Sequence, residues 1–394
     1  MLALEMYRSV AKTALGKAAG GRVPWLLTGA APLRLVTLDP PAARSGWARL
    51  KVRLSGICGS DLGMLSGKTS LYFSALVSLP FVPGHEVVAE LMEDCDDLPA
   101  GTRVVVDPVL GCLARGIEPC PACAVGETNR CSRVTVGDVS AGLQTGFCHD
   151  TGGGWSQQLV AHRSQLHPVP EGSEGLTDKQ ALLIEPIACA VHTALRAGLR
   201  EGDRVLVSGA GSVGLLATLA LRELTPAGEI LVVAKHGHQR ELALAFGATE
   251  TVAPSETLRR VRRSTGAFQL QPEMSSPYLL GGVDVAIDAV GSSESLETCL
   301  HATRAGGRVV LSGMPAKADL SAAWFRELDV VGTYASAHGE EAFAKATELA
   351  GHAAIARLAD TVATYPLHRW REALDHAYSA GRLGTVKVAF DPRS

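Results

Sequence analysis

Four of the nine cysteines lie close together in a segment rich in Gly and Pro. The run Cys120-Pro-Ala-Cys123 has the short chelating spacing of closed tetrahedral zinc sites, and Cys112 and Cys131 flank it. A zinc ion with four thiolate ligands has no open position, so it would stabilise the loop without taking part in chemistry. The alternative, four unrelated buried thiols, gives no reason for the clustering. We therefore predict a structural zinc at these cysteines, with the long step from Cys112 to Cys120 the least typical spacing.

A second set of candidate ligands is more dispersed. Cys58 stands in Gly-Ile-Cys58-Gly-Ser60-Asp61, the pair His85-Glu86 follows Pro-Gly, and Glu185 precedes a proline. A catalytic zinc generally keeps three protein ligands and an open position for water or substrate, and Cys58 with His85 would fit two of them. Each residue has an ordinary alternative, because a single Cys or His is often a core residue and an acid often a salt-bridge partner. The combination with a nucleotide site, described next, favours the catalytic interpretation.

The nucleotide signal is a glycine-rich turn between an apolar run and an apolar helix. In Val205-Leu-Val-Ser-Gly209-Ala-Gly211-Ser212-Val213-Gly214, Gly209 would make the tight turn, Gly211 would let the backbone approach a pyrophosphate, and Gly214 would allow close helix packing. Free N–H groups at the start of the helix would face the phosphates. Glycine-rich turns of structural origin also occur, but the strand before and the helix after this one indicate a dinucleotide site.

The next apolar run should end at the adenosine ribose of the cofactor. An acid typically stands there when the cofactor is NAD, because it binds the 2′-hydroxyl. This sequence has Ala234, followed by Lys235, His236 and Arg240, which could attract a 2′-phosphate. We therefore favour NADP over NAD. The alternative is that these basic residues are a solvated surface.

The elements around these motifs predict two domains in an α/β protein. Short β-rich runs broken by Gly, Pro and Asp extend from Arg34 to about His167, whereas helical periodicity alternates with Val/Ile/Leu runs after about Thr177. Such alternation is typical of a doubly wound parallel sheet. We predict a discontinuous β-rich domain over residues 1–180 and 337–394, with a Rossmann domain over residues 181–336. A helix is expected over Glu5 to Lys17, and a helix followed by a loop over Ser255 to Pro277.

Composition limits the partners. The 394 residues carry 37 Lys and Arg against 40 Asp and Glu, a formal charge of −3, which does not suggest nucleic-acid or membrane binding. The amino terminus does not have the pattern of a secretory signal, and no stretch reaches the roughly 18 apolar residues of a membrane helix. We expect a cytoplasmic protein, in which clustered cysteines more often bind metal than form disulfides.

From about Leu33 to Phe390 the chain resembles the medium-chain zinc dehydrogenases, the family of alcohol, sorbitol and threonine dehydrogenases. The motifs that carry the resemblance occur in this order: GICGSD, PGHE, the four cysteines, GGGWSQ, IEP and GAGSVG. The resemblance implies a GroES-like catalytic domain split by an inserted Rossmann domain. It also implies a homodimer or homotetramer whose sheets pair edge to edge through strands near Val309–Leu311 and Val330–Val331.

The resemblance also implies roles for the dispersed residues. Cys58 and His85 match direct ligands of a catalytic zinc, while Glu86 and Glu185 match positions that ligate directly or through water. Ser60 matches the hydroxyl that passes the substrate proton outward. Asp61 matches an acid that orients the histidine ligand, as metal-bound imidazoles generally require. Two departures from the family pattern are the longer first interval of the cysteine cluster, which predicts a small extra loop, and Ala234 in place of the ribose-binding acid.

These expectations converge on a zinc-dependent oxidoreductase that moves a hydride between an alcohol or polyol and its carbonyl with a nicotinamide cofactor. A related alternative is a reductase of a C=C or iminium bond in a specialised metabolite. An alternative from another class is a non-catalytic zinc-binding structural protein on the same fold. Retention of Cys58, Ser60, Asp61, His85 and Glu185 favours the first. The loop from Leu62 to Val82 has few charges and predicts either an apolar pocket lining or an internal or oligomer contact.

Overall fold

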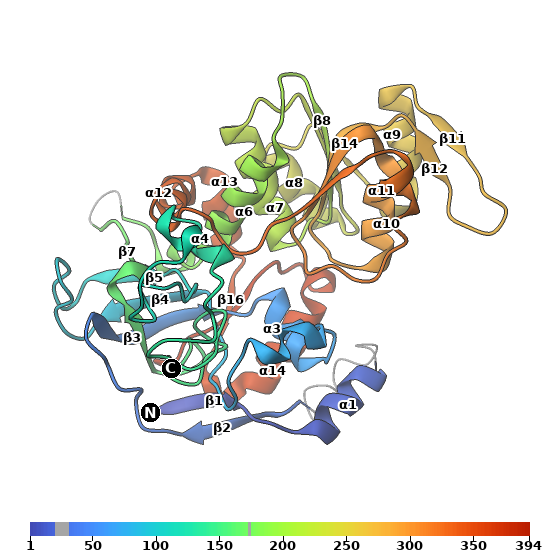
Figure 1. The fold of residues 1–394 in the computed structure, drawn as a ribbon. Helices are drawn as coiled ribbons and strands as arrows, with labels where there is room; N and C mark the ends of the chain where they lie inside the picture. Colours follow the sequence, from blue (N-terminus) through green and yellow to red (C-terminus); the bar gives the residue numbers. More distant parts are fainter. Residues whose placement is uncertain (20–30, 172–174) are drawn as a thin grey trace. The chain divides into compact units, whose positions relative to one another are not determined.

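The computed structural model describes residues 1–19, 31–171 and 175–394 (Figure 1). The chain divides into two compact units, one of Met1–Glu185 with Ala337–Ser394 and one of Pro186–Ser336. Within the described residues, no helix is both long enough and apolar enough to cross a membrane.

The unit of Pro186–Ser336 is built on a six-stranded sheet in the order β10-β9-β8-β13-β14-β15, in which every neighbouring pair is parallel. This is the order of the doubly wound Rossmann fold, which confirms the predicted fold class. The central strands β8, β9 and β13 are mostly Val, Ile and Leu because both faces of such a sheet are covered. They span Arg204–Ser208 (β8), Glu229–Val233 (β9), Glu250–Val252 (β10), Val283–Asp288 (β13), Thr303–Leu311 (β14) and Asp329–Gly332 (β15).

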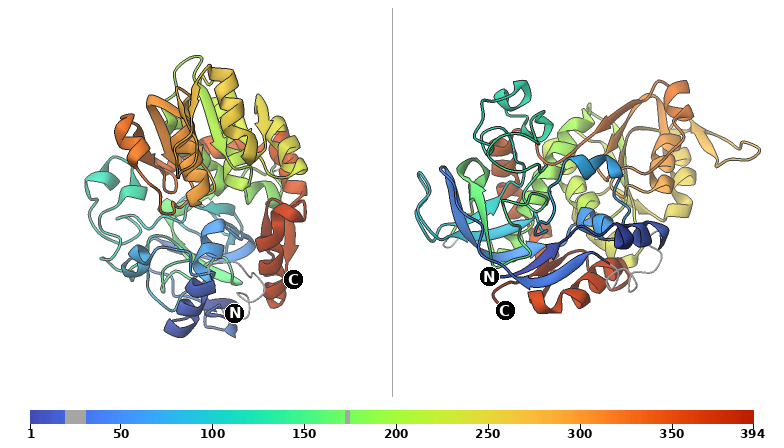
Figure 2. Two further views of the ribbon diagram at one scale, coloured as in Figure 1. Left: turned by 90° about the vertical axis from the view of Figure 1, so that its right-hand side faces the viewer. Right: turned by 60° about the horizontal axis from the view of Figure 1, so that its bottom comes forward.

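Helices connect these strands, as parallel pairing requires. A two-stranded antiparallel hairpin, β11 (Phe268–Leu270) and β12 (Tyr278–Leu280), follows α9 and extends away from the rest of this unit (Figures 1 and 2). The sequence predicted the helix but assigned the start of the hairpin to a loop. The helices of the unit are α7 (Ser212–Leu224), α8 (Gly237–Ala245), α9 (Thr257–Thr265), α10 (Ser293–Ala302) and α11 (Ser321–Phe325).

The other unit contains a seven-stranded sheet in the order β16-β17-β3-β4-β5-β7, with β6 also paired to β3. Its long central strand, β3, pairs antiparallel with β17. The last strand of the chain therefore belongs to the same sheet as strands from its first half. Leu50, Val52 and Leu54 on β3 are buried, and the first two belong to a core cluster with β4 and β5. The strands span Trp47–Gly56 (β3), Val87–Leu91 (β4), Arg103–Val106 (β5), Gln158–His162 (β6), Leu166–Pro168 (β7), Ala363–Tyr365 (β16) and Val388–Phe390 (β17).

The amino terminus differs from the prediction. Leu2–Met6 forms a strand, β1, paired antiparallel with β2 (Leu33–Thr37), and the helix α1 begins only at Val10 and ends at Ala19. The expected helix over Glu5 to Lys17 is therefore wrong at its start. Four of the five β1 residues are buried, and Met6 also forms a bridge with Phe81, so tertiary pairing overrides the local helical pattern.

Two helices, α3 (Gly59–Leu65) and α6 (Ile184–Ala197), carry Ser60, Asp61 and Glu185, whereas His85 and Glu86 lie in the loop before β4. The helix α3 follows β3, and α14 (Trp370–Ser379) packs against it, with the Tyr378 hydroxyl donating to the Leu62 carbonyl at 3.0 Å. The helix α6 has Glu185 and Pro186 in its first turn, where proline is tolerated. The remaining helices are α4 (Pro121–Ala124), α5 (Asp178–Ala181), α12 (Gly339–Ala350) and α13 (Ala353–Asp360).

Candidate functional site

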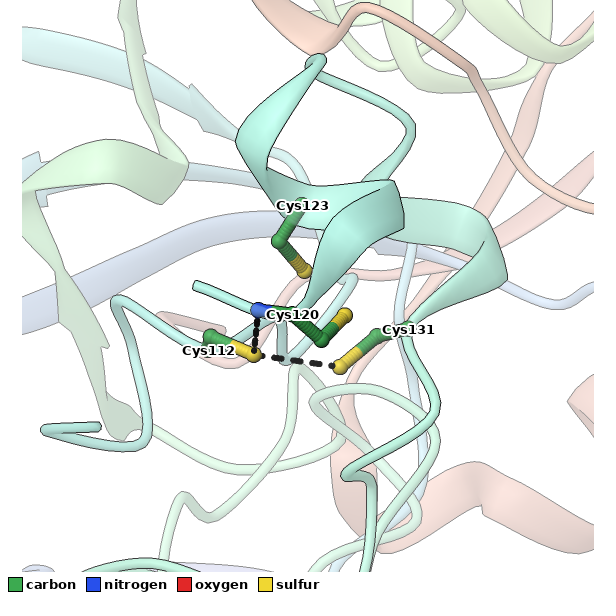
Figure 3. A group of neighbouring side chains, drawn as sticks. All are labelled: Cys112, Cys120, Cys123 and Cys131. Carbon is green, nitrogen blue, oxygen red and sulfur yellow. Dashed lines mark hydrogen bonds between the residues drawn. The ribbon is translucent and has the colours of Figure 1, made fainter. Parts of the chain in front are cut away.

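The four clustered cysteines converge on one point, and we call the segment from Cys112 to Cys131 the cysteine lobe (Figure 3). Their sulfur atoms all lie within 4.8 Å of one another, and the Cys112 and Cys131 sulfurs are 3.6 Å apart. A tetrahedral zinc with Zn–S bonds of about 2.3 Å requires sulfur separations of about 3.8 Å. The donor set therefore fits a closed zinc site without rearrangement of the chain.

The electrostatics of the cysteine lobe favour a bound cation. Backbone N–H groups of Cys123 and Ser132 lower the pKa of Cys120 to about 5, which favours its thiolate. Burial and neighbouring sulfurs raise the pKa of Cys123 and of Cys131, because several thiolates cannot share one site unless a positive charge compensates them. Zinc binding would deprotonate these remaining thiols.

The long first interval of the cysteine lobe holds a fully buried arginine, Arg115. Its guanidinium donates to the carbonyls of Leu110, Val139 and Gly142 at 3.1, 3.1 and 2.5 Å, and also to those of Val136 and Ser140. The extra loop between Cys112 and Cys120 thus anchors the segment that follows the lobe. The sequence predicted the loop but not this function of Arg115.

Around His85, side chains from two segments are brought together. The Cys58 N–H donates to Asp61 Oδ2 at 2.9 Å across the first turn of α3. Asp61 Oδ1 lies 3.4 Å from Nδ1 of His85, and the Ser60 hydroxyl lies 3.3 Å from Nε2 of the same ring. Burial would lower the pKa of His85, but Asp61 and Cys58 raise it well above its usual value. A contact with Asp61 at Nδ1 leaves Nε2 as the ring nitrogen able to bind a metal.

Glu86 is engaged by a residue that the sequence analysis missed, Lys387. The two side chains form an ion pair and each is only 3% exposed. Gly56 makes room for this pair, since a Cβ added there would lie 1.9 Å from Glu86 Oε2. The only signal in the sequence was a lysine placed between apolar residues in the strand-like run Val386 to Phe390.

Lys387 also links the other acidic groups of this region electrostatically. Burial would lower the pKa of Lys387, but Glu86 raises it above its usual value. Cys58 and Glu185 add to this increase, so both lie within the electrostatic reach of the lysine. Among the described residues, however, only the cysteine lobe gathers three or more potential ligand atoms within 4.8 Å. Cys58, His85, Glu86 and Glu185 are therefore not gathered as closely as the four cysteines are.

The glycine turn has the geometry that the sequence predicts. Gly209 has φ +106° and a Cβ there would lie 2.5 Å from Val290 Cγ2, while a Cβ on Gly214 would lie 1.9 Å from the Gly209 carbonyl oxygen. Gly211 differs, because a Cβ there would meet no atom within 4 Å and its φ of −81° suits any residue. The protein's own packing does not require this glycine, whereas a closely bound phosphate would. Ser212 and Val213 begin α7, and the N-terminus of a helix is a favourable place for a phosphate.

The end of β9 carries no carboxylate between Ala234 and Arg240. Ala234 is fully buried, and its carbonyl accepts a hydrogen bond from Arg240 Nε at 3.2 Å. Lys235 is exposed, and the rings of His236 and His238 stack with centroids 5.7 Å apart. The arrangement places a guanidinium beside the strand end where an NAD-binding acid would stand.

Comparisons with known proteins agree with this geometry. Residues 44–171 match the alcohol dehydrogenase GroES-like domain, and residues 212–351 match the zinc-binding dehydrogenase domain. The chain is 30% identical to a sorbitol dehydrogenase of Arabidopsis thaliana and 27% identical to an L-idonate 5-dehydrogenase of Vitis vinifera, each over 79% of both chains.

Solved structures share the same fold. A Sinorhizobium meliloti protein assigned as a zinc-binding dehydrogenase and bound to NADP has a TM-score of 0.69 and 27% identity, covering 91% of this chain and 95% of its own. A 2R,3R-butanediol dehydrogenase of Bacillus subtilis has a TM-score of 0.70 at 23% identity, covering 91% and 96%. The chain belongs to the zinc-dependent medium-chain dehydrogenase family.

Proposed function

We propose that this protein is a zinc-dependent oxidoreductase that transfers a hydride between an alcohol and its carbonyl with a nicotinamide cofactor. The observation that carries the proposal is the imidazole of His85, fixed between Asp61 and Ser60 beside Cys58. Asp61 at Nδ1 and the Ser60 hydroxyl at Nε2 orient this buried ring, as a metal-binding or proton-relaying imidazole requires. The names of the relatives, sorbitol and idonate dehydrogenases, support the same reaction class.

Cys58, His85 and Glu185 are our proposed ligands for a second zinc, besides the structural zinc of the cysteine lobe. When bound, a zinc with an open position supplies Lewis-acid polarisation of the substrate oxygen. Asp61 fixes the His85 ring so that Nε2 stays available. The Ser60 hydroxyl stands next to that nitrogen and would relay the substrate proton outward. Lys387 neutralises Glu86, which leaves Glu86 as a neighbour of the site and not a primary ligand.

We infer NADP as the preferred cofactor. Ala234 neither binds a 2′-hydroxyl nor repels a 2′-phosphate, and Arg240 is anchored at the Ala234 carbonyl through Nε, with its terminal nitrogens left to bind phosphate. NADP in the Sinorhizobium meliloti relative supports this assignment. Gly211 offers the close approach that the pyrophosphate needs.

A homo-oligomer formed through β15 is also part of the proposal. The strand β14 was expected to share this contact through Val309–Leu311, but it lies inside the sheet, paired with β13 and β15, so its edges are occupied. Only β15 ends this side of the sheet. Exposed apolar side chains flank it, since Trp324 is 83%, Phe325 67% and Val330 37% exposed. Light scattering should therefore find a dimer or tetramer, and a monomer at micromolar concentration would refute this part.

We also propose a reducing compartment such as the cytoplasm, where clustered cysteines bind metal more often than they form disulfides; none of the nine cysteines is in a disulfide.

The decisive experiment combines metal analysis with a coupled screen of alcohols, polyols and aldehydes with NADP(H) and NAD(H). We expect two zinc ions per chain and turnover that depends on the cofactor. One zinc per chain without turnover on any substrate would instead support the non-catalytic structural protein.

A further inference from the structure

The ring of Phe147 lies directly beside the His85 ring. Their centroids are 5.6 Å apart with an interplanar angle of 40°, and Phe147 is half-buried, so part of its ring remains open. We infer that Phe147 is a specificity-determining residue that makes this site select alcohols with an apolar substituent over polyols. This inference rests on the proposed function, because it concerns what binds next to the proposed zinc ligand His85.

Phe147 packs against buried apolar side chains, which hold its ring in place. Phe81 is only 3% exposed and packs against Phe147 with ring centroids 5.5 Å apart. Phe81 is in turn held by its hydrogen-bonded bridge to Met6. Leu62 and Met64 of α3 pack against the same apolar cluster. A molecule that reaches His85 therefore lies next to an apolar wall that cannot easily move aside.

The segment after Ser60 offers little to a polyol. Residues 62–82 contain one charged side chain, Lys68. The hydroxyls of Ser66 and Ser74 donate to the carbonyls of Gly63 and Leu71, at 3.1 and 2.6 Å. These polar groups are satisfied by the backbone of the segment itself.

Two further hydroxyls of this segment accept hydrogen bonds from the backbone instead of donating them. Ser70 Oγ accepts a hydrogen bond from the Tyr72 N–H at 3.3 Å, and Ser78 Oγ accepts one from the His149 N–H at 2.9 Å. Leu71 and Tyr72, by contrast, expose 64% and 75% of their surface. The segment thus presents exposed apolar surface such as Leu71, and its serine hydroxyls, including those of the exposed Ser70 and Ser74, are engaged in local hydrogen bonds.

Polyols and alcohols with an apolar substituent need different groups in the binding site. A polyol carries a hydroxyl on the carbons next to the reacting one, and each loses its water when it is placed against an aromatic ring. An alkyl or aryl substituent gains from the same contact. Pockets that recognise a hydroxyl need a polar partner for it, whereas apolar pockets discriminate about 10-fold or more per buried carbon group.

The test compares 1-hexanol with sorbitol on the zinc-loaded protein, with NADP and with NAD. We expect kcat/KM for 1-hexanol to exceed that for sorbitol by about 100-fold or more. The substitution Phe147→Ser should lower kcat/KM for 1-hexanol about 10-fold, mainly through KM, while sorbitol is unaffected or improved. Phe147→Leu should retain most of the preference because it keeps the wall apolar. Phe268→Ser, on an exposed residue of the other unit, is the matched control and should change neither substrate.

Each outcome decides the matter. Sorbitol oxidised as well as or better than 1-hexanol by the unchanged protein would overturn the inference while leaving the proposed reaction intact. An equal fall in kcat/KM for both substrates in Phe147→Ser would show that Phe147 only supports the fold. Zinc content measured on the same samples would show whether the variant has lost its metal. If Phe147→Ser does not fold, the ratio of kcat/KM for 1-hexanol to that for sorbitol in the unchanged protein still decides whether the site prefers an apolar alcohol. A chain that turns over no alcohol overturns this inference together with the proposed function.

Discussion

The cysteine lobe and the site around His85 hold their candidate ligands in opposite ways. In the lobe, four sulfurs from one short segment already lie within 4.8 Å of one another. Around His85, the polar atoms are instead held by neighbours, Asp61 and Ser60 for the imidazole and Lys387 for Glu86. A closed site is assembled by its own ligands, whereas an open one depends on side chains that keep the ligands apart and oriented. Substitutions in the lobe should therefore affect stability, and substitutions near His85 should affect turnover.

The largest expected effect is on turnover. Cys58→Ala should reduce kcat about 1,000-fold or more, because several kcal/mol of Lewis-acid stabilisation would be lost with the proposed second zinc. The fold should survive, since Cys58 Sγ is not part of the cysteine lobe. Steady-state kinetics and thermal unfolding on the same sample test this. A fall in the melting temperature as large as that caused by Cys112→Ser would remove the distinction between the two regions.

Loss of the structural zinc should have the next largest effect. Cys112→Ser replaces one of four thiolates and should lower the melting temperature by roughly 10 °C, because binding of a structural zinc contributes directly to folding. Prolonged chelation of the unchanged protein should produce the same shift. Cys148→Ser is the control, since Cys148 is a buried cysteine outside the lobe. If both serine variants lost equal stability and zinc content stayed constant, the lobe would not be a zinc site.

Lys387 lies near the His85 site but should affect stability, because it is a buried charge paired with Glu86. Lys387→Met should destabilise the protein by about 3–5 kcal/mol, since it leaves Glu86 buried without its partner. Adding Glu86→Gln should recover much of that loss, and Lys387→Arg should retain most of the stability. Chemical unfolding measures all three variants. Unchanged stability in Lys387→Met would mean that the pair contributes nothing.

The two regions also differ in what the sequence could predict. The cysteine lobe and the glycine turn were predictable because their ligands and backbone shapes are local, with fixed spacings such as Cys120 to Cys123. The Rossmann sheet was predictable because its central strands, β8, β9 and β13, are mostly apolar and alternate with helices. Lys387 was not, since its partner Glu86 lies near the other end of the chain and a lysine in a strand-like run usually faces solvent.

The remaining misses have the same physical origin. Arg115 acts through carbonyls of residues 136–142, which no local pattern specifies. The strand β1 was mistaken for the start of a helix because its partner β2 lies far along the chain, with pairs from Leu2–Thr37 to Met6–Leu33. Contacts of this kind depend on tertiary packing, which overrides local propensity.

A further prediction concerns the pH dependence of stability, to which His167 contributes outside both regions. This residue stacks on Phe343 with ring centroids 4.1 Å apart, and burial lowers the pKa of His167 to about 4. The unfolded chain takes up the proton near pH 6.5, so the stabilising contribution is complete above that pH. It is lost progressively as the pH falls from 6.5 toward 4, to a total of roughly 3 kcal/mol. His167→Phe should flatten this dependence in chemical unfolding experiments. An unchanged profile would assign the acid sensitivity to the metal sites.

The smallest expected effect concerns the cofactor, whose binding depends on neither metal site. Ala234 lacks the carboxylate that would bind a 2′-hydroxyl, and Arg240 lies at its carbonyl. A charge-assisted hydrogen bond contributes about 1.5–3 kcal/mol, so one such contact to the 2′-phosphate implies about a 10-fold or greater preference for NADP. Ala234→Asp should shift this preference toward NAD, because the new carboxylate would repel the phosphate, whereas Ala234→Ser should leave it nearly unchanged. Fluorescence titration with NADPH and NADH gives both affinities. Tighter binding of NADH to the unchanged protein would show that Arg240 and Lys235 face solvent and would reverse the assignment.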